Sequence, residues 1–110
     1  MEGWTIVMPG EDLPEARAVT ASLGDVTVML YRVGDRVFAV SNRCTHQGAP
    51  LHRGPVRAND LAPTVTCPAH GSVFSLADGK VRRGPATAPL QSFDARVNGY
   101  AIEVRPRAGV

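Results

Sequence analysis

Long apolar runs are absent from this sequence. No stretch of its 110 residues approaches the roughly 20 apolar residues that a membrane-spanning helix requires. The first residues, Met1-Glu2-Gly3-Trp4, lack the basic segment and the apolar core of a secretory signal peptide. We therefore expect a cytoplasmic, soluble protein with no membrane contact.

A strong charge of one sign is also absent. Twelve Lys and Arg residues face ten Asp and Glu residues, which leaves a formal net charge of +2. Because the basic residues are scattered along the chain, nothing indicates a surface for nucleic acid. Lys80, Arg82 and Arg83 form one short basic run. We expect it to be a solvated turn rather than a docking site for an acidic partner.

Cysteine is scarce, with two residues in the whole chain. In a small secreted domain, two cysteines would form a disulfide. Here no secretion signal is present, and a histidine lies two or three residues after each cysteine, so metal ligation is favoured. With 110 residues the chain has room for one domain, one core and one site.

Helical periodicity is almost missing, and short strands are expected instead. β-Branched and aromatic residues alternate with Gly, Asp and Asn turns, which predicts strands over 5–8, 26–32, 36–40, 92–97 and 100–105. Two hairpins follow, one around 33–35 and one around Asn98-Gly99. Segment 14–19 fits either a helical turn or a further strand. Trp4 and Tyr31 are expected in the core.

Between the two hairpins the composition changes to Gly, Pro, Arg and His. A stretch this long with so little regular structure normally needs a metal or a function to hold it. Short strands are expected at 65–66 and 73–76, with a turn at Asp78-Gly79. We expect one domain over 1–110, with a base formed by 3–41 and 90–106 and an inserted lobe over 42–89.

The lobe contains two motifs, Cys44-Thr45-His46-Gln47-Gly48 and Cys67-Pro68-Ala69-His70-Gly71. Two thiolates and two imidazoles suit either zinc or an iron–sulfur cluster. Zinc fingers usually group their ligands as Cys-x-x-Cys and His-x₃₋₅-His, whereas Cys and His alternate here, so iron–sulfur is favoured and zinc is the alternative. His52 has no cysteine partner and is expected to be a surface residue.

These motifs, with Ser72-Val73-Phe74 after the second, resemble those of the Rieske [2Fe–2S] ferredoxin family. The resemblance implies that Cys44 and Cys67 hold one iron and that His46 and His70 hold the other. It also implies an all-β fold, in which a Rieske-type antiparallel sandwich or small barrel carries a loop-rich cluster-binding lobe. In that lobe each cysteine points inward and each histidine outward.

The resemblance also assigns residues around the cluster. Gly48 and Gly71 would let the backbone pass close to it, where N–H groups point at the sulfurs. Gly84-Pro85-Ala86 is similar to the family's third loop, although Pro85 also fits a plain turn. High-potential members carry an extra Cys in each ligand loop, and the matching positions here are Ala49 and Ala69. They also carry a Ser and a Tyr, of which Ser72 is kept and Phe74 has replaced the Tyr. A low-potential centre is therefore expected.

The function that this resemblance implies is one-electron transfer from a flavin reductase to a terminal oxygenase. An alternative is the Rieske-type small subunit of a larger reductase, such as nitrite reductase. The chain itself cannot be an oxygenase, because only His52 would remain for a mononuclear iron site. The 20 residues between His46 and Cys67 are more than in the oxygenase ferredoxins, with the extra residues expected within 56–63. A small apolar docking rim is expected from Gln47, Ala49, Pro50, Leu51 and Pro85.

Overall fold

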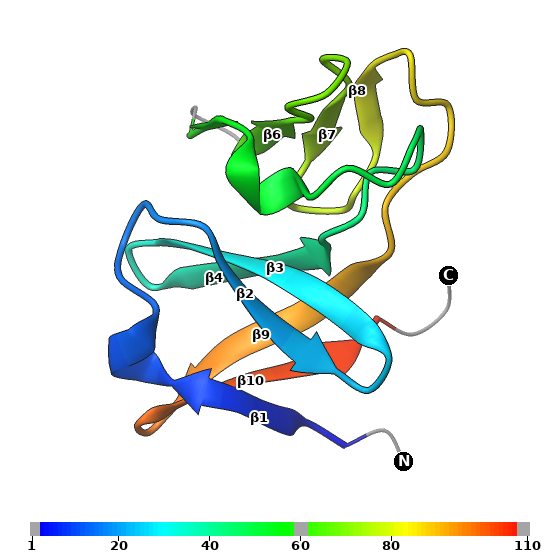
Figure 1. Cartoon of the computed structure of the whole chain (residues 1–110). Helices are drawn as coiled ribbons and strands as arrows, with labels where there is room; N and C mark the ends of the chain where they lie inside the picture. The colour runs from blue at the N-terminus through cyan, green and yellow to red at the C-terminus, as the bar shows by residue number, and fades with distance from the viewer. Residues whose placement is uncertain (1–2, 59–61, 108–110) are drawn as a thin grey trace.

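The computed structural model describes residues 3–58 and 62–107. In these ranges the chain forms ten strands and two short 3₁₀ helices (Figure 1). The strands are β1 (Thr5–Pro9), β2 (Val19–Leu23), β3 (Val26–Val33), β4 (Arg36–Ser41), β5 (Val56–Arg57), β6 (Thr64–Thr66), β7 (Val73–Ser75), β8 (Val81–Arg83), β9 (Ser92–Asn98) and β10 (Ala101–Pro106). The helices are η1 (Gly10–Asp12) and η2 (Leu51–Arg53). No helix in the described part of the chain has the length and apolar character to cross a bilayer.

Six antiparallel strands form the base, in the order β1-β10-β9-β4-β3-β2. The sheet curls until its two edge strands, β1 and β2, lie against each other, which makes a nearly closed barrel. The all-β expectation is confirmed. Segment 14–19 was expected to be a helical turn or a further strand, but only its last residue, Val19, lies in a strand. The rest of β2 was not predicted, because Ala21 and Ser22 carry little of the β-branched and aromatic signal.

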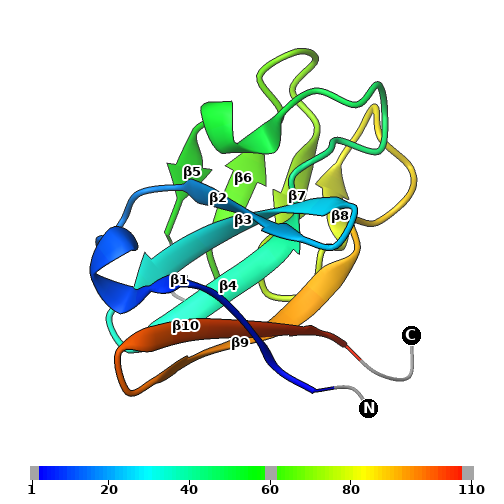
Figure 2. The same cartoon turned by 60° about the horizontal axis from the view of Figure 1, so that its bottom comes forward.

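The other four strands form a second sheet in the order β5-β6-β7-β8, inserted between β4 and β9 (Figure 2). One residue of each strand lies in a continuous apolar row, formed by Val56, Val65, Phe74 and Val81. The chain leaves the base at Ser41 and returns at Gln91, where the Ser41 N–H donates to the Gln91 carbonyl. Both ends of the inserted lobe are therefore fixed to the base at one point.

The hairpins of the base share one kind of two-residue loop. Each begins with a glycine at positive φ: Gly24 at 62°, Gly34 at 58° and Gly99 at 65°. This corrects the expected position of the last turn. Asn98 pairs with Ala101, so the loop is Gly99-Tyr100 rather than Asn98-Gly99. Only the first loop residue then needs the left-handed conformation, which glycine adopts without strain.

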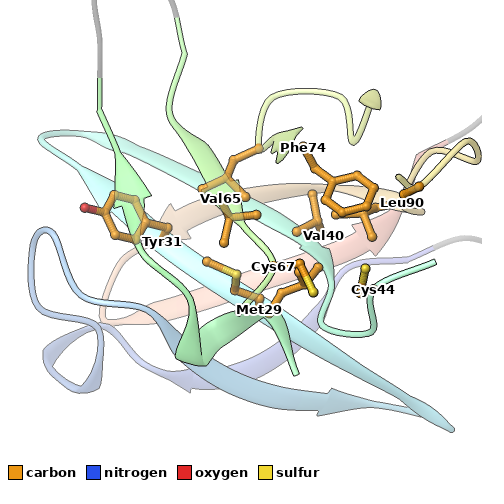
Figure 3. Packing of buried hydrophobic residues seen from close by; sticks show 11 residues of the cluster. Met29, Tyr31, Val40, Cys44, Val65, Cys67, Phe74 and Leu90 are labelled. Carbon is orange, nitrogen blue, oxygen red and sulfur yellow. The ribbon is translucent and has the colours of Figure 1, made fainter. Parts of the chain in front are cut away.

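Strand β3 connects two hydrophobic cores because both of its faces are buried. Val28 and Leu30 point into the barrel, where they join Phe93, Ile102 and Val104. Met29 and Tyr31 lie on the opposite face and pack against the lobe in a second cluster (Figure 3). The alternation of side chains along a strand produces this division. The expectation that Tyr31 is a core residue is confirmed.

The position of Trp4 was predicted wrongly. Its ring is half-buried and lies between two guanidinium groups, those of Arg96 and Arg105, at 4.0 and 4.3 Å from the ring centroid. Arg96 in turn pairs with Glu103, and Arg105 with Asp94. Trp4 therefore stacks on an ion-paired surface of the base and is no part of either core.

Candidate metal centre

The two Cys/His loops have the same backbone hydrogen bonds. In the first loop the Cys44 N–H donates to the Ala49 carbonyl (3.0 Å) and the Gly48 N–H to the Cys44 carbonyl (2.7 Å). In the second loop the Cys67 N–H donates to the Ser72 carbonyl (2.7 Å) and the Gly71 N–H to the Cys67 carbonyl (3.1 Å). Counted from the cysteine, each bond joins the same positions. The two loops are thus copies of one closed turn.

The fourth residue after each cysteine is a glycine at positive φ, 79° for Gly48 and 82° for Gly71. A side chain in this conformation would be strained, which explains the glycine in both motifs. N–H groups at the glycines were expected to point at the sulfurs. They do not, because the glycine N–H groups close the turns. The sulfurs are instead faced by the N–H groups two and three residues after each cysteine: His46 and Gln47 at Cys44, and Ala69 and His70 at Cys67.

The two thiols are buried, with 2% of Cys44 and 3% of Cys67 exposed, and neither forms a disulfide. Burial raises the pKa of the Cys44 thiol, and the adjacent Cys67 raises it further. Burial also acts to raise the pKa of Cys67, but the N–H groups of Ala69 and His70 and the Cys44 thiol outweigh it and hold that pKa below its ordinary value. The two thiols therefore lie close enough to interact with each other, and backbone N–H groups face both sulfurs.

The two histidines lie on the outer side of the loops. The rings of His46 and His70 meet edge to face, with their centroids 5.1 Å apart. His46 is half-buried and His70 is exposed, whereas both cysteines point into the buried cluster beside Leu90 and Phe74 (Figure 3). The structure thus separates the four side chains into an inner pair of sulfurs and an outer pair of rings, as expected.

A third loop, 84–90, is fastened to both Cys/His loops. The Ala86 N–H donates to the Oγ of buried Ser72 (2.9 Å), and the Thr45 hydroxyl donates to the Ala88 carbonyl (2.6 Å). At its far end the Leu90 N–H donates to the Gly79 carbonyl (2.8 Å). Pro85 is exposed on this loop. The Ser72 hydroxyl accepts from Ala86, so its own proton is still available for a second acceptor.

One residue of the expected docking rim, Leu51, and the separate expectation for His52 need correction. Leu51 is completely buried in the cluster that joins lobe and base, so it cannot form part of a docking surface. His52, expected on the surface, is half-buried and hydrogen-bonded to Asn42. Gln47, Pro50 and Pro85 are exposed, as a rim would require. The extra residues expected within 56–63 fall partly outside the described residues, and 56–57 form β5.

Sequence analysis missed two residues of this region. Thr45 was noted only as the residue between Cys44 and His46, yet it anchors the third loop. Arg43 was not noted at all, yet its guanidinium lies against Gly48, 3.2 Å from where a Cβ would be. No local pattern reveals either contact, because each depends on how the loops pack together.

The donor set fits a two-iron cluster. Two adjacent sulfurs and two adjacent imidazoles supply a pair of ligands for each of two irons, and N–H groups directed at the sulfurs suit their negative charge. Within the described residues, no three His, Cys, Asp or Glu side chains converge as the ligands of a single metal ion. The two sulfurs form one pair and the two rings form the other.

Comparison with known proteins gives consistent matches. A sequence model of the Rieske [2Fe-2S] domain matches residues 3–94. The 3-phenylpropionate/cinnamic acid dioxygenase ferredoxin subunit of Escherichia coli (strain K12) is 34% identical over 94 residues, which cover 86% of this chain and 85% of the relative. The ferredoxin of carbazole 1,9a-dioxygenase from Nocardioides aromaticivorans IC177 has a TM-score of 0.86 at 30% identity, covering 94% of this chain and 98% of that one. A protein from Mycobacterium tuberculosis described as an NADH-dependent nitrite reductase small subunit has a TM-score of 0.83 at 30% identity, covering 100% and 99%.

Proposed function

Since the chain belongs to the Rieske [2Fe–2S] domain family, we propose that Cys44 and Cys67 bind one iron of its cluster and that His46 and His70 bind the other. The observation that supports this assignment best is the shared geometry of the two loops, which holds the sulfurs together inside and the rings together outside. Zinc, the alternative, would need all four side chains directed at one ion. We also propose that residues 1–110 form a single domain, with a base at 3–41 and 90–106 and a cluster-binding lobe at 42–89.

When bound, a Rieske cluster accepts and releases one electron, at a potential between about −150 and +300 mV. The residues of this chain fix where in that range it lies. The N–H groups of His46, Gln47, Ala69 and His70 stabilise negative charge on the cysteine sulfurs. Neither Ala49 nor Ala69 supplies a thiol for a disulfide beside the site, and Phe74 supplies no hydroxyl. With so few additional donors, we expect a low potential for this class.

The chain is an electron carrier and is not itself a catalyst. Two similar proteins are named as ferredoxins of dioxygenases, the subunit from E. coli and the ferredoxin of carbazole 1,9a-dioxygenase. By this similarity, the acceptor of the electron is a terminal oxygenase. We further propose that a flavin reductase donates the electron and that the exchange takes place in the cytoplasm. The inner sulfurs are protected from water by the core, while the rings of His46 and His70 reach the surface where a partner approaches.

A second function, that of a reductase small subunit, is supported by one specific observation. The M. tuberculosis protein described as a nitrite reductase small subunit covers this chain from end to end at the same 30% identity as the carbazole dioxygenase ferredoxin. A small subunit of a larger reductase would remain attached to its large subunit during purification, whereas a carrier would be purified alone. Because two similar proteins are named as ferredoxins of dioxygenases, we favour the carrier function.

The cluster assignment is tested by spectroscopy on anaerobically purified protein. We expect two irons and two acid-labile sulfides per chain, a red-brown colour, and after dithionite reduction the EPR signal of a mixed Cys/His cluster. Cys67→Ser should abolish the cluster, and His70→Cys should change its EPR signal. His52→Ala is the matched control: it removes the third imidazole and a hydrogen bond to Asn42, so it should lower stability but keep the EPR spectrum of the unchanged protein. A colourless protein with stoichiometric zinc would overturn the assignment.

A further inference from the structure

Charge is distributed unequally between the two parts of the molecule. Segment 42–89 contains six Lys and Arg residues and two Asp and Glu residues, which gives a formal charge of +4. The remaining chain contains six basic and eight acidic residues, which gives −2. Of the two acidic residues in the lobe, Asp78 lies in the turn between β7 and β8, and Asp60 lies outside the described residues. The net charge of +2 conceals a strongly basic lobe.

Arg43 places one of these positive charges beside the first Cys/His loop. It directly precedes Cys44, and its exposed guanidinium lies against Gly48. With Thr45, His46 and Gln47 it borders a surface hollow of about 490 Å³ that reaches Cys44. Asp25 and Arg43 both border an adjacent hollow, but they form no ion pair among those of the described residues. The Arg43 charge is therefore available to a partner that approaches His46.

Arg82 and Arg83 place two more charges beside the second and third loops. Both are exposed on β8, which corrects the expectation that the basic run would be a turn. Arg83 pairs with Val73, the residue that follows Ser72 in the second loop, and it directly precedes Gly84-Pro85. With Arg57, the two arginines border a groove of about 560 Å³ on the outer face of the lobe sheet, whose other lining residues are Pro55, Thr64, Thr66 and Val73.

Within residues 3–58 and 62–107, no acidic side chain forms an ion pair with any of these arginines. The ion pairs among the described residues join only Arg96, Arg105 and Arg107 to Asp94 and Glu103, all in the base or directly after it. No acidic residue borders the groove beside Arg82 and Arg83. Unpaired surface cations cost little in water, but at a binding face they select partners of opposite charge.

The surface beside the exposed His70 is small and carries no Asp, Glu, Lys or Arg. We call the exposed Pro68, Ala69, His70 and Pro85 the tip face. It carries the exposed imidazole and apolar groups that are desolvated easily. Arg43 lies on the first loop beside it, and Arg82 and Arg83 lie at the strand that leads into the third loop. An apolar centre with a charged rim is the usual anatomy of a weak, transient interface.

We propose that Arg43, Arg82 and Arg83 form a cationic rim that docks the acidic face of a redox protein onto the tip face. This inference rests on the proposed function, because it assumes a cluster beneath that face. The rim would steer an acidic partner and orient it with its electron acceptor towards His70. One electron then passes between the two proteins, and no bond is formed or broken and no proton moves. A neutral or basic partner surface would gain nothing from this rim.

The proposal is tested with two inorganic oxidants of opposite charge, hexacyanoferrate(III) and hexaammineruthenium(III). The holoprotein is reduced, and its oxidation by each reagent, a one-electron transfer to the metal ion, is followed by stopped flow at several ionic strengths. We expect the rate with the anionic oxidant to fall as salt is added and the rate with the cationic oxidant to rise. Arg82→Glu/Arg83→Glu should slow the anionic reaction about 10-fold at low salt.

The matched control is Arg17→Glu/Arg36→Glu, which changes the net charge equally with two exposed residues of the base. It should retain most of the rate. As an acidic polypeptide probe, immobilised poly-L-glutamate should retain the unchanged protein and the control to a higher salt concentration than the rim variant. The proposal of a cationic rim would be overturned if the two double variants slowed the anionic reaction equally. It would also be overturned if salt changed the rates with the two oxidants in the same direction. Failure to find the cluster would overturn the proposed function instead, and the absorption spectrum of each sample distinguishes the two cases.

Discussion

Asn42 holds His52 at two points. The Asn42 Oδ1 accepts the backbone N–H of His52 at 2.7 Å, and the Asn42 Nδ2 lies 2.9 Å from the His52 Nδ1. Because a backbone N–H only donates, Oδ1 must face it and Nδ2 must face the ring. The Nδ1 of His52 therefore accepts a hydrogen bond, and the proton of the neutral ring is on Nε2. His52 is thus a structural residue rather than a free surface histidine.

This contact closes the base of the first Cys/His loop. Asn42 is 7% exposed, its N–H donates to the Thr27 carbonyl, and its carbonyl accepts from Leu51. Asn42 thereby connects Thr27 of strand β3 with Leu51 and His52 of helix η2. We predict that Asn42→Ala destabilises the holoprotein by about 1–3 kcal/mol, since it leaves half-buried groups of His52 without partners. Denaturant unfolding measures the change. The control is Gln91→Ala, which changes an exposed side chain where the chain returns from the lobe to the base. It should lower stability by no more than about 0.5 kcal/mol. Equal costs would contradict the assigned role.

The local features of this fold could be predicted from the sequence. The strong hairpin signals at β3–β4 and β9–β10 placed four strands of the base, and the glycines of the two motifs indicated positive φ. For the hairpins and the glycines the information lies within a few neighbouring residues. Burial of each Cys and exposure of His70 were implied by the resemblance of the motifs to the Rieske family.

What could not be predicted depends on distant partners. Leu51 was expected in a surface rim, but it is buried in the same cluster as Met29 and Tyr31 of β3. Trp4 was expected in the core, but guanidinium groups from β9 and β10 flank its ring. The last hairpin turn was misplaced by one residue, because both Asn98-Gly99 and Gly99-Tyr100 satisfy local turn preferences.

The two anchors of the third loop differ in burial, and we predict that they differ in energy. Ser72→Ala leaves the buried Ala86 N–H unpaired and should cost about 1–3 kcal/mol. Thr45→Val removes a bond in an exposed position and should cost about 0.5–1.5 kcal/mol. Both should speed the loss of cluster absorbance in the presence of an iron chelator. Thr87→Val, in the same loop, serves as the control and should change neither quantity. A larger effect for Thr45→Val than for Ser72→Ala would contradict this ranking.

Gly79 lies in the turn between β7 and β8, where it packs against Leu90 at the end of the third loop. A matched pair of variants tests how much space there is for a side chain at this contact. A Cβ at Gly79 would lie 2.3 Å from the Leu90 carbonyl oxygen, whereas a Cβ at Gly24 would meet nothing within 4 Å. Their φ angles are similar, 78° and 62°. Gly24→Ala should therefore cost about 1–2 kcal/mol from backbone strain alone. Gly79→Ala should cost about 1–3 kcal/mol more from overlap. Thermal unfolding of both variants measures the difference. Similar melting temperatures would show that the turn can shift away from the Leu90 carbonyl at little cost.

Phe74 occupies the position where high-potential members of the family carry a tyrosine. It is completely buried in the cluster that contains both cysteines, whereas the hydroxyl of Tyr31 lies at the opposite end of that cluster from Cys44 (Figure 3). We predict that Phe74→Tyr raises the reduction potential, because a hydroxyl donor near the sulfurs stabilises the added negative charge. Voltammetry of the holoprotein measures the shift, and Tyr31→Phe, which removes a hydroxyl far from the sulfurs, should leave the potential unchanged. If the new hydroxyl found no sulfur, the potential would stay constant and the protein would lose stability, since an unpaired hydroxyl would be buried. The potential and the unfolding free energy, measured on the same variant, therefore decide whether the missing hydroxyl of Phe74 contributes to a low potential.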